Sequence, residues 1–358
     1  MDILIKNARI VNEGETFESD LLIKNRRIHK LSTTISAKNY KIIDLNGNYL
    51  MPGVIDDQVH FREPGLTHKA NIFSESRAAV AGGITSFMEM PNTNPPVLSQ
   101  DLLQQKFDIA KHNSLANYSF FMGVSNTNIN EVLKTDFSKV PGLKIFMGSS
   151  TGNMLVDDFT VLNNIFSNVE GLIAVHCEDE STIKENIIKY KTKFGENVPI
   201  EYHPNIRSEE ACYKSTALAV SLAKMYSTRL HVLHISTERE LDLFSNDIDL
   251  KQKKITSEAC IHHLTFTVND YKKRGAFIKW NPAVKSEKDN DAIWKALLDN
   301  RIDVIATDHA PHTAEEKRQS YFNCPSGAPM VQHALTVMLQ HHLNNKISVE
   351  KIVEKMCH

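Results

Sequence analysis

The sequence predicts an α/β protein whose parallel strands close into a (β/α)8 barrel, preceded by a small β-rich segment. Two observations carry this prediction. The first fifty residues consist of short stretches of alternating apolar and polar residues, and from Val54 onward an apolar strand, a polar loop and a helix follow one another repeatedly. Strands that alternate with helices form a parallel sheet, and eight such units, in roughly 250 residues, are enough to close a barrel.

The N-terminal region contains the stretches ILIKNARIV, DLLIKNRRIHKL and KIIDLNGNYL, which are broken by Asn, Gly and Glu. Short alternating runs with such breaks are typical of β-hairpins. Beyond them we expect eight strands, at residues 54–61, 84–90, 116–124, 142–148, 172–179, 229–236, 254–261 and 302–309. Helices are expected between most of these strands, for example in HKANIFSESRAAVAGG, SEEACYKSTALAVSLAKMYS and DNDAIWKALLDN.

The composition narrows the class of protein. The 358 residues include 41 Lys and Arg against 43 Asp and Glu, so a nucleic-acid or membrane-surface partner is not expected, whereas a small anionic substrate remains compatible. Five scattered cysteines without a CxxC pair are typical of a reduced protein. The N-terminus does not resemble a signal peptide, and no stretch approaches the ~18 apolar residues of a membrane span. We therefore expect a soluble, cytoplasmic protein.

Polar residues end or interrupt five of the predicted strands. They are His60, Lys144, His176, His234 and Asp308. Because the carboxyl ends of barrel strands meet at one rim, these side chains are expected to gather there, and such a set indicates a metal-dependent hydrolase site. Taken singly, each has an ordinary explanation, such as a hydrogen-bonded histidine, a lysine reaching solvent or a helix cap. The coincidence of all five at equivalent positions favours one shared site.

Three further histidines are expected to be structural. His231 is out of phase with His234 on the same strand and is predicted to pack elsewhere. His262 and His263 lie just beyond the seventh strand, and we expect a structural role for both.

The chain resembles the dihydroorotases, a family of the amidohydrolase superfamily, from about residue 1 to its end. The resemblance is carried by PGVIDDQVHFREPGLTHK, MEMPNTNPP, GLKIFMGSSTGN, AVHCED, HVLHIST, KWNPAVKSEKD and IATDHAPHT. It implies a barrel with one or two Zn²⁺ ions and reversible hydrolysis of dihydroorotate to N-carbamoyl-L-aspartate in pyrimidine biosynthesis. It also implies a small β-sandwich built from both chain ends, which gives domains at 1–52 and 53–345 and a returning segment at 346–358. A homodimer is plausible from the same resemblance.

The resemblance also implies roles for the strand-end residues. His60, Lys144 and Asp308 surround one metal ion, and Lys144, His176 and His234 surround the other. Lys144 carries a carbamate, because an ordinary cationic lysine cannot bridge two ions. Asp157 or Asp158 is the alternative bridge. Asp308 is the expected general acid and base, because a carboxylate beside the attacking water can pass its proton to the departing ring nitrogen.

Substrate contacts follow from the same resemblance and from charge. Arg62 lies two residues beyond His60, and an arginine fork pairs with a carboxylate such as that of dihydroorotate. A surface ion pair with Glu63 is the alternative explanation for this arginine. Asn92 and His312 resemble the other carboxylate-binding groups. Contacts to the ring amide are expected from Asn281, Ser326 and Gly327.

Two features depart from the family pattern. Gln58 stands where the family usually has the first histidine of a His-x-His motif, and an amide oxygen is a weaker donor than imidazole. Gln58 is therefore either a poor ligand or a hydrogen-bonding neighbour of the site. The sequence stops at His358, where the remaining strands of the sandwich should follow, so we expect either an incomplete small domain or a native protein with a further C-terminal tail. Two other functions stay open: another cyclic amidase of the allantoinase or dihydropyrimidinase kind, and a non-catalytic scaffold.

Overall fold

The computed structural model describes residues 2–36, 39–148 and 153–358. The chain divides into two compact units, one formed by Met1–Ile55 with Thr336–His358 and the other by Asp56–Leu335. The Ser149–Gly152 part of the GLKIFMGSSTGN motif lies outside the described residues.

The first unit contains a five-stranded sheet in the order β3-β2-β1-β4, with β5 also paired to β1. Its strands are β1 (Ile3–Asn12), β2 (Glu15–Lys24), β3 (Arg27–Ser32), β4 (Lys41–Asp44) and β5 (Tyr49–Leu50). The antiparallel pairs β1–β2 and β2–β3 confirm hairpins in this region.

The hairpin predicted over residues 41–50 is wrong, because β4 and β5 both pair in parallel with β1. Between them, Gly47 N–H donates to the carbonyl of Asn7 at 2.8 Å, so this stretch runs alongside β1 and does not fold back on itself. Alternation predicts a strand, but it does not identify the strand's partner.

The same unit contains the C-terminal helix α13 (Val349–Cys357), and α12 (Ala334–Leu343) precedes it. Ser348 caps α13 by accepting a hydrogen bond from the N–H of Lys351 at 3.1 Å.

Parallel strands form the centre of the second unit, in a three-stranded sheet β6-β7-β8 and a six-stranded sheet β14-β13-β12-β11-β10-β9. Their bounds are β6 (Val54–Val59), β7 (Ile84–Glu89), β8 (Asn117–Phe120), β9 (Met122–Gly123), β10 (Leu143–Phe146), β11 (Ile173–His176), β12 (Leu230–Val232), β13 (Ile255–Cys260) and β14 (Val304–Ala306). Each of the eight predicted strand positions contains a strand, and the α/β class with parallel sheets is confirmed.

Two junctions connect the sheets. β9 follows β8 after one residue, and a parallel bridge joins Val59 to His309, supported by a 2.7 Å hydrogen bond from His60 N–H to the carbonyl of His309. The carboxyl ends of β6 and β14 are thereby brought together. Strands such as β11 are buried along their whole length, as expected for parallel strands covered on both faces.

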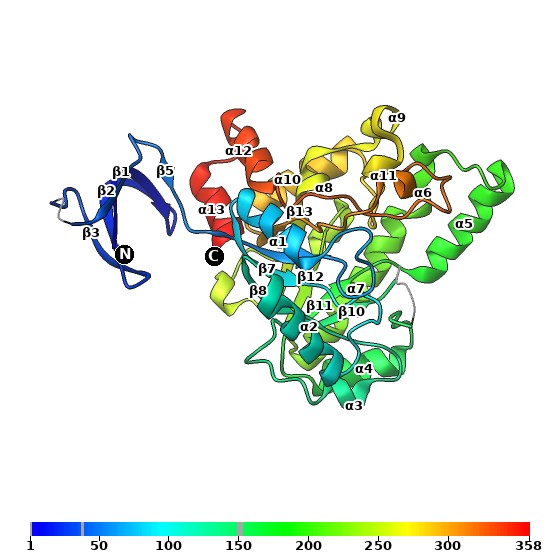
Figure 1. Ribbon diagram of the computed structural model, residues 1–358. Helices are drawn as coiled ribbons and strands as arrows, with labels where there is room; N and C mark the ends of the chain where they lie inside the picture. The colour runs from blue at the N-terminus through cyan, green and yellow to red at the C-terminus, as the bar shows by residue number, and fades with distance from the viewer. Residues whose placement is uncertain (1, 37–38, 149–152) are drawn as a thin grey trace. The chain divides into compact units, whose positions relative to one another are not determined.

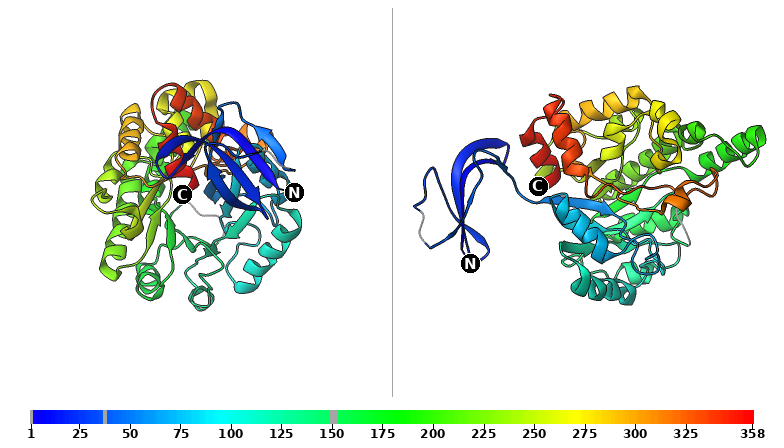
Figure 2. Two further views of the ribbon diagram at one scale, coloured as in Figure 1. Left: turned by 90° about the vertical axis from the view of Figure 1, so that its left-hand side faces the viewer. Right: turned by 45° about the horizontal axis from the view of Figure 1, so that its top comes forward.

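Helices lie around these strands, as Figures 1 and 2 show. They are α1 (Ile72–Ala81), α2 (Gln100–Asn113), α3 (Ile129–Val132), α4 (Phe159–Asn168), α5 (Glu180–Phe194), α6 (His203–Ile206), α7 (Glu209–Tyr226), α8 (Ile261–Thr265), α9 (Tyr271–Arg274), α10 (Glu287–Leu298) and α11 (Ala314–Lys317). Short 3-10 turns occur at Ile200–Tyr202, Arg239–Leu243, Leu250–Gln252, Val268–Asp270 and Gly275–Ile278.

The helices that the sequence predicts begin at residues whose side chains cap the free N–H groups of the first turn. Asn71 and Ser286 each form a capping box, at the start of α1 and α10, and Ser208 accepts a hydrogen bond from the N–H of Ala211 at the start of α7. Among the described residues, no helix combines the length and the apolar composition needed to cross a bilayer.

Candidate active site

A cavity of about 690 Å³ opens at the carboxyl ends of the parallel strands of the second unit. All eleven predicted site residues line it: His60, Arg62, Asn92, Lys144, His176, His234, Asn281, Asp308, His312, Ser326 and Gly327. Gln58 lines it as well. The residues come from segments far apart in the sequence, so the fold brings the whole predicted set to one place. Their individual roles remain predictions.

Three cavity residues have left-handed backbone conformations. The φ angle is 69° at Arg62, 41° at His234 and 46° at Asp308. Residues other than glycine rarely adopt such angles, which cost on the order of 1–3 kcal/mol each, and residues of this kind cluster at functional sites. The surrounding structure therefore holds these three side chains in place at some cost in stability.

His60 and Asp308 form the first pair of candidate ligands. Nδ1 of His60 lies 2.7 Å from the side-chain oxygen of Asn92, and Nε2 lies 3.0 Å from a carboxylate oxygen of Asp308. Because the oxygen of Asn92 accepts the Nδ1 proton, the neutral ring presents the lone pair of Nε2 to Asp308. Burial lowers the pKa of His60, although Asp308 opposes the shift. Two electron-pair donors that face each other are suited to share a cation.

His176 and His234 form the second pair, with 3.0 Å between Nδ1 of His176 and Nε2 of His234. Nε2 of His176 donates to the carboxylate of Glu178 at 2.9 Å, and Arg207 also bonds to that carboxylate. Burial alone raises the pKa of Glu178, but Arg207 and His176 outweigh it and lower the pKa to about 2. A histidine oriented by an ionised carboxylate in this way is typical of a metal ligand.

The second pair also presents lone pairs to the cavity region. Burial, reinforced by the neighbouring His176 and Lys144, lowers the pKa of His234 well below its usual value. The buried Nδ1 of His234 has no hydrogen-bond partner among the described residues. Neutral imidazoles and a carboxylate are the donors that Zn²⁺ prefers in proteins, so the two pairs fit this ion.

Lys144 lies on β10 and is only 1% exposed, with its Nζ 4.6 Å from the centre of the Phe146 ring. Burial lowers the pKa of Lys144 to about 8, although Asp308 and Glu258 oppose the shift. A larger fraction of this lysine is therefore neutral near pH 7 than of an exposed lysine, and only the neutral amine can react with CO2.

The two alternative bridging residues lie elsewhere. Asp158 caps α4 by accepting a hydrogen bond from the N–H of Thr160 at 2.7 Å, and Asp157 accepts one from the side chain of Asn126 at 3.2 Å. Both carboxylates are exposed, and neither lines the cavity. Of the three candidates, Lys144 alone lines the cavity.

Two basic side chains lie on one side of the cavity, Arg62 and Lys69, and Lys69 also pairs with Glu316 at 3.1 Å. A nitrogen of the Arg62 fork lies 2.9 Å from Nε2 of His312, and Nε of Arg62 donates to the carbonyl of Pro311 at 3.0 Å. Lys69 approaches Nδ1 of His312 at 3.1 Å. Burial, Arg62 and Lys69 together lower the pKa of His312 to about 3, so its ring is neutral. This corner of the cavity is suited to bind an anion.

The proposed contacts to a ring amide are only partly available. Gly327 already donates its N–H to the carbonyl of Lys279 at 2.8 Å and accepts from Lys317 at 2.8 Å. The carbonyl of Ser326 lies 3.0 Å from Nε2 of His312. Of these two residues, only Ser326 is therefore expected to contact a ligand. Gly327 is needed for its small size, because a Cβ there would lie 2.6 Å from the carbonyl oxygen of Ala310.

Gln58 is 1% exposed and has a neighbour that the sequence did not indicate. Its side-chain oxygen lies 3.6 Å from the thiol of Cys260, which is a weak donor. The oxygen is therefore turned partly toward β13 while the side chain still lines the cavity. The same thiol lies closer to Glu258, at 3.1 Å, so both interpretations of Gln58 remain predictions.

Sequence reasoning missed Lys69, Glu178 and Arg207, although Lys69 and Arg207 line the cavity. Lys69 and Glu178 belong to the quoted PGLTHK and AVHCED motifs, so these motifs were the available signal. Arg207 lies between α6 and α7, and no motif in the sequence marks it. His262 and His263, expected to be structural, are buried and do not line the cavity; His262 stacks on Trp280 with 4.2 Å between ring centres.

Parallel strands whose carboxyl ends place histidines, a lysine and an aspartate around one cavity define a hydrolase of the amidohydrolase superfamily. A family model described as Dihydro-orotase-like matches residues 47–240, which is more than half of the chain. The chain therefore belongs to the dihydroorotase-like family.

Similar proteins agree with this assignment. The chain is 30% identical to a dihydroorotase from Bacillus cytotoxicus over 99% of its own length and 82% of the relative's. It is 29% identical to a dihydroorotase from Methanosarcina mazei, over 98% and 78% of the two lengths. Among solved structures, an L-hydantoinase (dihydropyrimidinase) from Arthrobacter aurescens aligns over 100% of this chain and 81% of its own, with a TM-score of 0.93 and 27% identity.

Proposed function

We propose that this chain is a dihydroorotase, which hydrolyses the cyclic amide of dihydroorotate to N-carbamoyl-L-aspartate and catalyses the reverse ring closure in pyrimidine biosynthesis. The observation that carries the proposal is the position of Arg62. Its guanidinium lies in the cavity wall beside His312 and Lys69. Burial lowers the pKa of Arg62 to about 10, so it remains cationic at neutral pH. A substrate with a carboxylate beside its amide matches this arrangement.

Five residues would hold one or two Zn²⁺ ions in the cavity: His60, Lys144, His176, His234 and Asp308. When bound, zinc polarises the amide carbonyl and lowers the pKa of water bound to it. Asn92 and Glu178 would orient the two histidines to which they are hydrogen-bonded, as carboxylates and amides around metal sites do.

Asp308 would move the proton. Asp308 has a left-handed backbone just beyond β14, and its carboxylate lies 3.0 Å from Nε2 of His60 in the cavity wall. In hydrolysis it accepts a proton from the attacking water and delivers it to the ring nitrogen as the C–N bond breaks. The reverse steps close the ring, because the same group can return the proton.

Lys144 would carry a carbamate. The neutral amine attacks CO2, a new N–C bond forms, and one amine proton is released, which leaves an anionic group with two oxygens. The burial that lowers the pKa of Lys144 favours this reaction, because it increases the fraction of neutral amine.

Several finer features belong to the same proposal. The parallel sheets would form a closed (β/α)8 barrel, and the β1–β5 sheet would belong to a small β-sandwich at residues 1–52 with a returning segment at 346–358. The protein would be a cytoplasmic homodimer acting on a small molecule. These expectations are supported by the resemblance of the chain to its family.

A second candidate, a hydantoinase-type cyclic amidase, is favoured by the likeness to the Arthrobacter aurescens enzyme. A substrate panel of dihydroorotate, dihydrouracil, hydantoin and allantoin separates the two. We expect dihydroorotate to be the best substrate. Faster hydrolysis of hydantoin or allantoin would overturn the proposal, and no turnover of any panel member by zinc-loaded protein would favour a non-catalytic scaffold.

The variant Arg62→Met sharpens this test. Loss of a charge-assisted contact worth about 1.5–3 kcal/mol should lower kcat/KM for dihydroorotate roughly 10- to 100-fold, with little effect on dihydrouracil, which has no carboxylate. Arg318→Met is the matched control, because Arg318 is exposed and does not line the cavity. Equal losses for both substrates would contradict carboxylate recognition by Arg62.

A further inference from the structure

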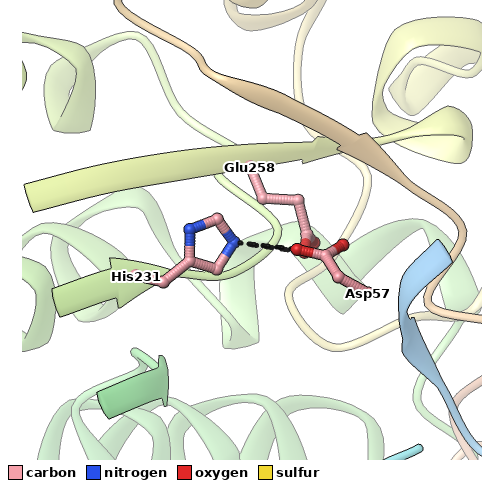
Figure 3. A group of neighbouring side chains, drawn as sticks. All are labelled: Asp57, His231 and Glu258. Atoms are coloured by element: carbon pink, nitrogen blue, oxygen red, sulfur yellow. Dashed lines mark ion pairs between the residues drawn. The ribbon is translucent and has the colours of Figure 1, made fainter. Parts of the chain in front are cut away.

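A second group of metal-type side chains lies outside the cavity. It consists of Asp57 on β6, His231 on β12 and Glu258 on β13, and Figure 3 shows the three side chains pointing toward one another. Nε2 of His231 lies 3.4 Å from an oxygen of Asp57 and 3.6 Å from an oxygen of Glu258. None of the three residues lines the cavity, so this buried cluster is separate from the candidate active site.

The hydrogen bonds around His231 fix the orientation of its lone pair. The hydroxyl of Thr256 donates to the carbonyl of Leu230 at 3.4 Å, and its oxygen lies 2.8 Å from Nδ1 of His231. That oxygen therefore accepts the Nδ1 proton. The neutral ring then presents an unprotonated Nε2 to the two carboxylates. Burial lowers the pKa of His231, which also favours the neutral ring.

Two of the atoms that face each other in the buried cluster, Nε2 of His231 and Oε2 of Glu258, are buried without a hydrogen bond among the described residues. Oδ1 of Asp57 is unpaired there as well, while its other oxygen, Oδ2, faces His231. His231 is 5% exposed and Glu258 is 0% exposed. The other oxygen of Glu258 is already bonded, to the N–H of His234 at 3.0 Å and to the thiol of Cys260 at 3.1 Å.

The charge of the two carboxylates is not balanced by a basic side chain. In the described part of the chain, the ion pairs of Asp57 and Glu258 are both with His231. A buried acceptor without a partner costs on the order of 1–3 kcal/mol, so an unpaired imidazole nitrogen between two carboxylates indicates a cation site.

We propose that the buried cluster binds one divalent transition metal ion of the Zn²⁺ type, separate from any ion in the cavity. The distances fit this ligand. With Zn–N and Zn–O bonds of roughly 2.0–2.2 Å, two donors at a tetrahedral angle lie about 3.4 Å apart. The observed 3.4 and 3.6 Å match this separation and exceed the roughly 2.7–3.2 Å of a hydrogen bond.

The ligand types and the charge agree with the same ion. Two carboxylates balance the double positive charge, and the imidazole favours zinc over magnesium or calcium, which prefer oxygen ligands. The side chain of Asp57 is 18% exposed, so an ion can enter from its side. β6 and β12 are not neighbours in the strand order, so the ion would connect strands that share no hydrogen bonds.

Diffraction at the zinc absorption edge tests the proposal on crystals of the unmodified, zinc-loaded protein. We expect an anomalous peak between Asp57, His231 and Glu258, in addition to any peak in the cavity. Zinc content measured by plasma mass spectrometry should fall by about one ion per chain in Asp57→Asn. The matched control is Asp56→Asn, which changes the adjacent buried carboxylate; Asp56 bonds to Thr307 and lies outside the cluster.

The outcomes separate this site from the proposed active site. No peak at the buried cluster in a crystal that contains zinc in the cavity would overturn the inference and would mean that the carboxyls share protons. Equal zinc content in the wild type and folded Asp57→Asn would overturn it too. A peak at the cluster alone would support the inference and contradict the cavity metal. If Asp57→Asn does not fold, the crystal of the unmodified protein still decides.

Discussion

The cavity site and the buried cluster both use residues on or just beyond β6 and β12 and both combine histidine with carboxylate, yet they differ in what surrounds the ligands. In the cavity, His60 and His176 each donate one ring proton to a neighbour, Asn92 or Glu178, and their other nitrogen faces a second candidate ligand, Asp308 or His234, at 3.0 Å. In the cluster, Nε2 of His231 faces both carboxylates, and none of the three residues lines that cavity. The first arrangement leaves room for a substrate. An ion held by the second would connect buried strands, so its role would be stability.

The positions of His231 and His234 show where the regular alternation of side chains along a strand ends. β12 contributes His231 to the cluster and is followed by His234 in the cavity. On a regular strand these positions would face opposite sides. β12 ends at Val232, and the φ angle of 41° at His234 turns its side chain into the cavity. His231 does lie outside the cavity, as predicted, but phase alone could not identify its partners Asp57 and Glu258.

Replacement of Asp308 should have the largest effect on the cavity site and should leave the buried cluster intact. Asp308→Asn keeps the size of the side chain but cannot accept the proton, so we expect kcat for dihydroorotate to fall at least ~10³-fold. The matched control is Asp157→Asn, which alters an exposed aspartate outside the cavity and tests the alternative bridge. Steady-state kinetics measure both, and an Asp308→Asn enzyme within tenfold of wild type would remove Asp308 from the chemistry.

Lys144 tests whether the cavity depends on a carbamate. We expect Lys144→Ala to lose activity ~10²-fold or more and to bind less zinc in the cavity, because the bridging anion is absent. Metal-free wild type, reloaded with zinc in bicarbonate-free buffer, should regain activity slowly, and added bicarbonate should speed the recovery. Recovery that does not depend on bicarbonate would contradict the carbamate. Full activity in Lys144→Ala would exclude any bridging role.

The sequence predicted most of the fold and of the cavity for a physical reason. Apolar runs bounded by polar loops predict parallel strands, and the carboxyl ends of such strands share one rim, so residues like His176 and Asp308 could be placed together. Arg62 reached the cavity through a turn with a φ angle of 69°, and not through strand register with His60.

Contacts that depend on packing between distant segments could not be predicted. The thiol of Cys260 meets the side chain of Gln58 across 202 residues, and Arg207 meets Glu178 from the turn between two helices. The pairing of β4 and β5 with β1 has the same origin, because alternation carries no information on the partner strand.

The smallest expected effect is a change in protein stability with pH, which arises from the carboxyl groups of the buried cluster. In the metal-free protein, burial, reinforced by Glu258, raises the pKa of Asp57 to about 7, and burial raises the pKa of Glu258 to about 8. The ordinary values are near 3.9 and 4.3. Between these values and the raised ones, the folded chain holds protons that the unfolded chain has released. The free energy of unfolding due to these groups therefore falls as pH rises through about 4 to 8.

Other groups titrate in the same range, including buried histidines with lowered pKa values, so the informative quantity is the difference between the wild type and Asp57→Asn. Asparagine has no proton to lose. The melting temperature of the metal-free wild type, relative to Asp57→Asn, should therefore fall by about 2–4 °C between pH 5 and pH 8. Zinc added at pH 8 should reverse this change in the wild type through the cluster, because the ion replaces the lost protons. If the difference in melting temperature between wild type and Asp57→Asn stays constant with pH, Asp57 is ionised throughout this range. The carboxylates of the buried cluster would then not hold extra protons in the metal-free protein.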